Sequence, residues 1–211
     1  MSHTKTLTFK ADNLGTNATL LLIFDGASDG LYKDKFPVVW KLGRFAAAGS
    51  HLLNAAFTSQ LAWLKPATDM DSIVGAPAYK VINYNQKTTL QQNGSGVLSF
   101  TPPETGTADS VTVVNGTSNR QDVALGFLPK GAFSPIPVYY WNGLGSGQSI
   151  QTKFQPVLRV YIASDYKEGQ IVRGEISSSV IFEQDLSALG DNTILNLSYN
   201  YSTGMFSITQ A

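Results

Sequence analysis

Residues 194–209 read ILNLSYNYSTGMFSIT, and this stretch decides the fold class. Its apolar and aromatic side chains fall at every second position from 195 to 201, with Asn or Ser between them. A period of two places alternate side chains on opposite faces of a β-strand. The segment Ser202-Thr203-Gly204 then separates this run from residues 205–209, and a three-residue loop ending in glycine is typical of a hairpin. The sequence therefore predicts an antiparallel hairpin here.

The same pattern continues toward the amino terminus. In residues 156–163 every second side chain is aliphatic. Short apolar or β-branched runs, bounded by Gly, Pro and Asn turns, indicate further strands. These runs cover residues 6–11, 19–25, 37–42, 51–58, 79–84, 88–91, 97–101, 110–114, 122–128, 136–141, 150–154, 170–175 and 179–182. We expect helix only as short turns near 183–189 and 45–48. The prediction is one all-β domain over residues 1–211, a two-sheet antiparallel β-sandwich, with a closed β-barrel as the alternative.

Composition limits the classes of partner. The chain has 211 residues, of which 43% are hydrophobic and 14% charged, and it contains no cysteine. A chain of this length buries enough apolar surface to need no disulfide, and the missing cysteines favour a cytoplasmic setting. Fifteen basic residues balance fifteen acidic ones, so nothing directs the protein to nucleic acid. No apolar run has the length of a membrane span.

Catalytic motifs are missing from the sequence. A Ser-His-Asp triad needs a histidine base, and His3 and His51 are the two histidines of the chain. The phosphate-binding loop and the nucleophile elbow are absent. Residues 143–147, GLGSG, are interpreted as a flexible turn. We therefore expect a protein that is not an enzyme.

Two acidic turns are weak candidates for a divalent metal ion. Asp25 and Asp29 lie in one turn, and Asp69 and Asp71 lie in another. Carboxylate oxygens are the ligands that Ca²⁺ and Mg²⁺ prefer, yet neither turn has the spacing of an EF-hand. Aspartate is also common in turns because it bonds its own backbone.

Aromatic residues are the strongest candidates for a binding site. Rings beside amide side chains can hold a sugar or a flat small molecule, although such rings are also typical of a β-sandwich core. His51 is added because it begins a predicted strand and can face a pocket. The predicted ligand-binding residues are Trp40, Trp63, Tyr139, Tyr140, Trp141, Asn142 and His51.

Three segments resemble those of small, cysteine-free β proteins from mushroom-forming fungi. They are FPVVWK at 36–41, TSQLAW at 58–63 and INYNQKTTL at 82–90. The pink chromoprotein of oyster mushrooms is similar in size and style. The resemblance implies a non-covalent, indolone-type aromatic chromophore, an accompanying metal ion, and an intracellular fungal protein. It covers about a quarter of the chain, and no binding residue is transferred from it.

Three functions stay open at this point. The first is a non-enzymatic small-ligand-binding protein, such as a pigment carrier. The second is a cytosolic lectin that binds carbohydrate. The third is a storage or defence protein that self-associates through strand edges. A homodimer is a further expectation, because it is the commonest assembly. The sequence identifies neither the ligand nor the strand order.

Overall fold

Strands extend along almost the whole chain in the computed structural model, which describes residues 3–26 and 29–211. The helical element of this part of the chain is one short 3-10 helix, η1 (Leu186–Ala188). None of its helices is long and apolar enough to span a bilayer. Across the same residues the strands form four sheets.

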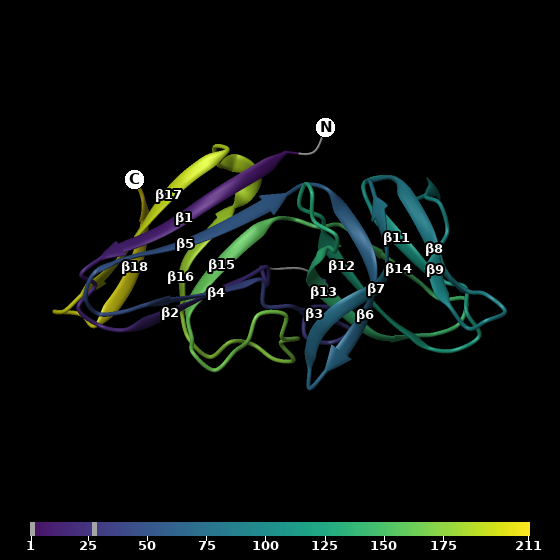
Figure 1. The fold of residues 1–211 in the computed structure, drawn as a ribbon, viewed down its shortest axis with the longest axis horizontal. Helices are drawn as coiled ribbons and strands as arrows, with labels where there is room; N and C mark the ends of the chain where they lie inside the picture. The colour runs from purple at the N-terminus through teal and green to yellow at the C-terminus, as the bar shows by residue number, and fades with distance from the viewer. Residues whose placement is uncertain (1–2, 27–28) are drawn as a thin grey trace.

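Two of these sheets lie on the left in Figure 1, and one of them contains the first and the last strand. The terminal sheet has the order β18-β17-β1-β5, and the cleft sheet has the order β16-β15-β2-β4. The terminal sheet consists of β1 (Thr4–Asp12), β5 (Ser50–Thr58), β17 (Asn192–Asn200) and β18 (Met205–Gln210). The cleft sheet consists of β2 (Ala18–Ile23), β4 (Lys41–Phe45), β15 (Val157–Ile162) and β16 (Val180–Asp185).

The other two sheets form the opposite half, on the right in Figure 1. The long sheet has the order β3-β13-β12-β6-β7 and the small sheet has the order β10-β8-β11-β14, with β9 paired to β8. The long sheet consists of β3 (Lys35–Pro37), β6 (Leu61–Asp69), β7 (Ser72–Ile82), β12 (Gln121–Phe127) and β13 (Ile136–Leu144). The small sheet consists of β8 (Gln86–Gln92), β9 (Leu98–Phe100), β10 (Glu104–Thr105), β11 (Val111–Asn115) and β14 (Ser149–Thr152).

One hydrophobic core joins the four sheets. It includes Leu7 of the terminal sheet, Leu22 of the cleft sheet, Trp63 of the long sheet and Val113 of the small sheet. Phe24 lies at its centre, and its ring centroid is 5.2 to 6.3 Å from those of four other aromatic rings, Trp40, Phe57, Phe127 and Phe154. Edge-to-face and tilted pairs of this kind add stability beyond the burial of their area.

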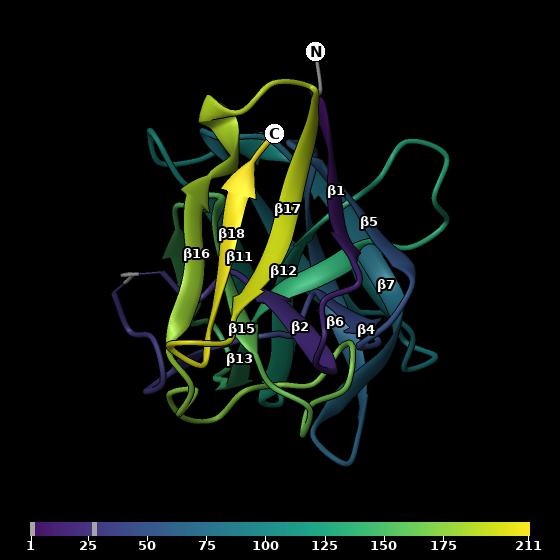
Figure 2. The ribbon, with the colours of Figure 1, turned by 90° about the vertical axis from the view of Figure 1, so that its left-hand side faces the viewer.

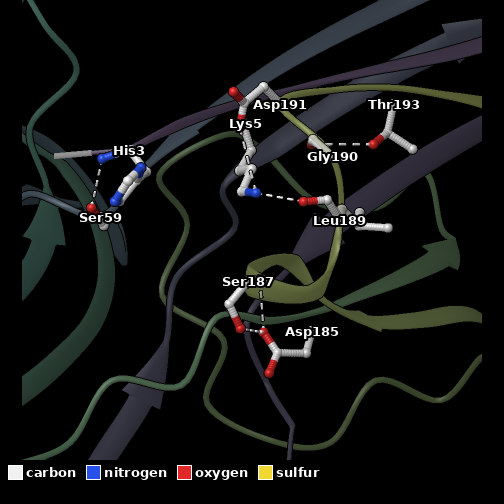
Figure 3. A network of polar contacts seen from close by, with 9 residues as sticks. All are labelled: His3, Lys5, Ser59, Asp185, Ser187, Leu189, Gly190, Asp191 and Thr193. Carbon is white, nitrogen blue, oxygen red and sulfur yellow. Dashed lines mark hydrogen bonds and ion pairs between the residues drawn. The ribbon is translucent and has the colours of Figure 1, made fainter.

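The first strand, β1, lies beside the second-to-last strand, β17, and the two are parallel (Figure 2). Polar contacts fix the point at which both strands begin (Figure 3). The Lys5 ammonium donates to the Leu189 carbonyl and lies 3.6 Å from an Asp191 carboxylate oxygen. Asp185 caps the η1 turn by accepting from the Ser187 backbone N–H at 2.8 Å. These contacts hold the η1 segment against the terminal sheet.

The all-β sandwich predicted from the sequence is confirmed. Its sheets are open rather than closed into a barrel, and there are four of them among the described residues instead of two. Two strand pairs, β1–β17 and β8–β11, are parallel. The carboxyl-terminal hairpin forms with Leu197 opposite Ile208, and Gly204 adopts a positive φ of 69°. The helical turn expected at 45–48 is wrong, because these residues end β4 and enter a bend.

Candidate functional site

A cleft of about 1160 Å³ lies beside the cleft sheet. We call it the central cleft. Its walls come from the end of β2, the turn at 29–35, the segment that follows β14, strand β15 and the segment 175–180. Few of the lining residues are aliphatic, namely Leu31, Ile176 and Val180. The cleft therefore suits a ligand with many polar groups.

Asp25 lies at the wall of this cleft, two residues after the end of β2, a strand that is buried on both faces. Leu20, Leu22 and Phe24 enter the main core, while Leu21 and Ile23 pack into a second cluster on the other face of the sheet. Side chains alternate along a strand, so Asp25 continues the face of Leu21 and Ile23. Asp25 is itself only 4% exposed.

Two tyrosine hydroxyls hold one oxygen of the Asp25 carboxyl group. Tyr161 donates to Asp25 Oδ2 over 2.8 Å, and Tyr32 donates to the same oxygen over 3.1 Å. Tyr161 lies on the same face of β15 as Arg159, whose Nη1 donates to the Asp25 backbone carbonyl over 3.3 Å. The arrangement fixes the carboxyl group at the wall of the cleft.

The second oxygen of this carboxyl group, Oδ1, is buried and has no hydrogen-bond partner among the described residues. Burial raises the pKa of Asp25 above its usual value, against the lowering effect of the two tyrosine hydroxyls and of Arg159. An unpartnered buried oxygen is costly, so such atoms are rare in folded proteins. Oδ1 of Asp25 can therefore still accept a hydrogen bond from a donor.

Tyr32 stands on a strained piece of backbone beside Asp25. Its φ is +62°, a left-handed conformation that bulky residues rarely adopt. The turn is closed by the Tyr32 N–H, which donates to the Lys35 carbonyl over 2.8 Å. Strain of this kind is found most often at ligand-binding and switch regions. The Tyr32 hydroxyl also makes the longer of the two bonds to Asp25, so it is the easier one to displace.

Charges of the two signs balance along the cleft. Asp25, Asp29 and Glu175 are its acidic residues, and Lys35, Lys153 and Arg159 are its basic residues. Arg159 also pairs with Glu183. Lys35 is only 4% exposed, and its ammonium lies 4.9 Å from the Tyr139 ring centroid. Burial lowers the Lys35 pKa, although Asp29 and Asp34 act in the opposite direction. This balance favours a neutral ligand over a strongly charged one.

The aromatic residues predicted from the sequence to bind ligand lie mainly in the core. Trp40, Trp63, Tyr139 and Trp141 are at most 7% exposed, and the Trp63 and Trp141 ring centroids lie 5.4 Å apart. Trp40 nevertheless lines a cavity of about 320 Å³ between β4, β7 and β13. Trp141 lines another of about 300 Å³ that adjoins the central cleft. Their role in binding stays a prediction.

The remaining predicted residues lie elsewhere. The Tyr140 hydroxyl donates to Asp122 over 2.7 Å and is 3.5 Å from Asn142, and burial raises the Tyr140 pKa. A ring nitrogen of His51 contacts the Ala48 carbonyl at 2.9 Å. None of these three predicted residues lines the central cleft.

The two acidic turns are also separate. Asp25 and Asp29 line the central cleft, whereas Asp69 and Asp71 lie in the β6–β7 hairpin, where Asp71 pairs with Arg173 at 2.9 Å. In the part of the chain that the structure describes, no three acidic or histidine side chains gather into a possible metal site. Metal binding at Asp25 and Asp29 stays a prediction.

Sequence reasoning missed Tyr32, Tyr161 and Arg159 as site residues. One signal was present: five apolar residues, 20–24, end directly in Asp25. A charged group that continues a fully buried strand needs partners, and β15 supplies them. The pairing of β15 with β2, in which Tyr161 lies opposite Leu21, is not encoded in either segment alone.

Comparison with known proteins found no matching protein-family model, no matching curated protein and no matching solved structure. The resemblance to fungal β proteins therefore stays an expectation, and the site has to be interpreted from its own chemistry.

Proposed function

We propose that the protein binds a small polar ligand in the central cleft without transforming it, and that this ligand is a carbohydrate. The observation that carries the proposal is the buried, unpartnered Oδ1 of Asp25 at the wall of this cleft. A sugar hydroxyl is a neutral donor of the kind that this oxygen lacks. Because Oδ1 is buried as well as unpartnered, a ligand reaches it when a neighbouring side chain moves aside.

Two further features support a carbohydrate. The cleft presents amide and hydroxyl groups from Gln151, Thr152 and Gln155, which can both donate and accept hydrogen bonds. Its balanced charges also suit a neutral polyol. Neither histidine of the chain lines the cleft.

A glycan array tests the proposal directly. The wild-type protein is expected to bind a defined group of glycans and to release them chemically unchanged, as mass spectrometry of the eluted sugar would show. Lys153→Ala and Gln155→Ala change exposed residues of the cleft wall and should weaken binding about tenfold, which is the loss of one good polar contact. Lys130→Ala, an exposed change in the loop between β12 and β13, is the matched control and should bind normally. An array without any bound glycan would contradict the proposal.

A pigment carrier is the second candidate, and the cavity beside Trp40 favours it. This cavity combines Trp40, Leu64, Ile73 and Ile136 in a largely aliphatic wall, which suits a flat aromatic molecule. The protein purified from its native source would then absorb beyond the tryptophan band and lose that absorbance on denaturation. A spectrum with the tryptophan band alone, and no quenching of tryptophan fluorescence by added indole-like compounds, would remove this candidate.

A further inference from the structure

Two smaller depressions adjoin the central cleft. The end depression, of about 300 Å³, shares Asp29, Lys35, Gln151 and Thr152 with it. The side depression, of about 870 Å³, shares Ile176 and Ser178 with it. None of the described residues lines both of the smaller depressions. The central cleft therefore lies between them, bounded by different walls on its two sides.

Each depression contains aromatic and polar side chains together. Trp141 and Ser149 both line the end depression, and Tyr166 and Asn17 both line the side depression. The central cleft supplies Tyr32 and Tyr161. A ring that packs on an apolar face and polar groups that orient the hydroxyls are the two elements of sugar recognition. Their recurrence in three adjacent depressions fits a ligand with repeating units.

Ser178 provides a second, independent observation. It lies on the wall shared by the central cleft and the side depression, and its hydroxyl oxygen is buried without a hydrogen-bond partner. Asp25 and Ser178 are thus two unpartnered polar groups along the same line of depressions. Ser178 lies at the place where a ligand in the central cleft would continue into the side depression.

Acidic and basic residues occur together in the side depression, as they do in the central cleft. The side depression adds Arg44 and Asp165, one charge of each sign, so the balance found in the central cleft is kept. A polyanionic chain would meet acidic residues in each of the three depressions. A neutral chain meets no such repulsion.

We infer that the three depressions form one extended site for a linear, neutral oligosaccharide, with one sugar ring in each depression. This inference rests on the proposed carbohydrate function and adds the length and linear shape of the ligand. Trp141 and Tyr166 mark the two ends of the site, and Ser178 lies at the junction between two of its three subsites.

Calorimetric titration with cello- and chito-oligosaccharides, from the monosaccharide to the hexamer, tests the inference. Affinity should rise by at least about tenfold from monomer to trimer and then level off, because further units extend beyond the site. Tyr166→Ala, in the side depression, should reduce trimer binding about tenfold and leave monomer binding unchanged. Tyr79→Ala, a change on the partly exposed outer strand β7, is the matched control and should alter neither.

The possible failures are distinguishable. Binding that does not depend on chain length, or a Tyr166→Ala effect that is equal for monomer and trimer, would overturn the extended site while leaving the carbohydrate function intact. If sugars of every length fail to bind, the proposed function fails together with the extended site.

Discussion

The Asp25 carboxyl group loses solvation on folding and regains only part of it from hydrogen bonds. Tyr161 and Tyr32 satisfy Oδ2, and Oδ1 has no partner among the described residues. The raised pKa follows from this imbalance, since burial disfavours the charged form more than the two hydroxyls favour it. At the scale of single residues, this group makes the most specific predictions.

The first prediction concerns the pH dependence of stability. Below about pH 3 Asp25 is largely protonated in both the folded and the unfolded chain. As the pH rises, the unfolded chain releases its proton first, so Asp25 lowers the free energy of unfolding by about 1.4 kcal/mol for each unit by which its pKa is raised. Asp25→Asn removes this loss and keeps an oxygen that can accept from both tyrosines. Urea unfolding between about pH 4 and pH 8 should therefore give a smaller decline for Asp25→Asn than for the wild type. If the two variants lost stability in parallel with rising pH, burial would not raise the pKa of Asp25.

The second prediction separates the two tyrosines. Tyr161→Phe should lower the free energy of unfolding by about 2 kcal/mol, because Tyr161 is 4% exposed and makes the shorter bond to Asp25. Tyr32→Phe should cost less, because its bond is longer and its ring is partly exposed. Chemical denaturation of both variants at neutral pH measures the difference. Equal costs, or a larger cost for Tyr32, would contradict the view that Tyr32 is the displaceable partner.

At the scale of elements, strands β12 and β13 approach each other so closely at one point that a glycine is required there. The pairing shifts between Leu125 and Gly126, which indicates a bulge. A Cβ at position 126 would lie 2.2 Å from the Ile136 carbonyl oxygen, so only glycine fits there. The long sheet depends on this close approach.

Gly126→Ala is therefore expected to lower the free energy of unfolding by about 2 kcal/mol or more, because the two backbones must separate. Gly75→Ala in β7, the edge strand of the same sheet, is the control, since a Cβ there meets nothing within 4 Å. Thermal unfolding monitored by circular dichroism compares the two. A Gly126→Ala variant as stable as the control would contradict the close packing at the bulge.

The sequence predicted most strands, from alternation or from short apolar runs, but it missed β6. Strand β6 begins with Leu61, Ala62, Trp63 and Leu64, all of them buried, so no period of two is visible. The segment 170–175 was expected to be a strand, but only isolated bridges form there, between Ile171 and Val38 and between Gln170 and Ser72. Polar and apolar residues alternate only in a strand that has one solvated face. A strand that is buried on both faces therefore shows no such pattern in the sequence.

The site was less predictable than the fold for a related reason. Rings such as Trp63 and Tyr139 looked like binding residues by type, and the structure buries them in the core. Tyr161 and Arg159 looked like ordinary strand residues, and the pairing of β15 with β2 brings them to Asp25. Contacts between residues more than a hundred positions apart depend on strand order, which local periodicity does not encode.

At the scale of the whole molecule, one core joins all four sheets. Phe24 directly follows β2 of the cleft sheet, Phe57 belongs to the terminal sheet and Phe127 belongs to the long sheet. The rings of these three residues are in contact. Halves that share such a core cannot lose their packing separately. We therefore expect one cooperative unfolding transition in scanning calorimetry, with equal calorimetric and van't Hoff enthalpies. Two resolved transitions would show that the halves fold as separate domains.

The central claim is that a sugar occupies the central cleft next to Asp25. Nuclear magnetic resonance of the ¹⁵N-labelled protein, titrated with the tightest ligand from the glycan array, tests it most directly. The account predicts that the largest amide shifts cluster at Asp25, Tyr32, Gln151 and Ser178, while the β6–β7 hairpin and the β17–β18 hairpin stay unchanged. Shifts centred on the cavity beside Trp40 or on either hairpin, with the cleft residues unmoved, would contradict it.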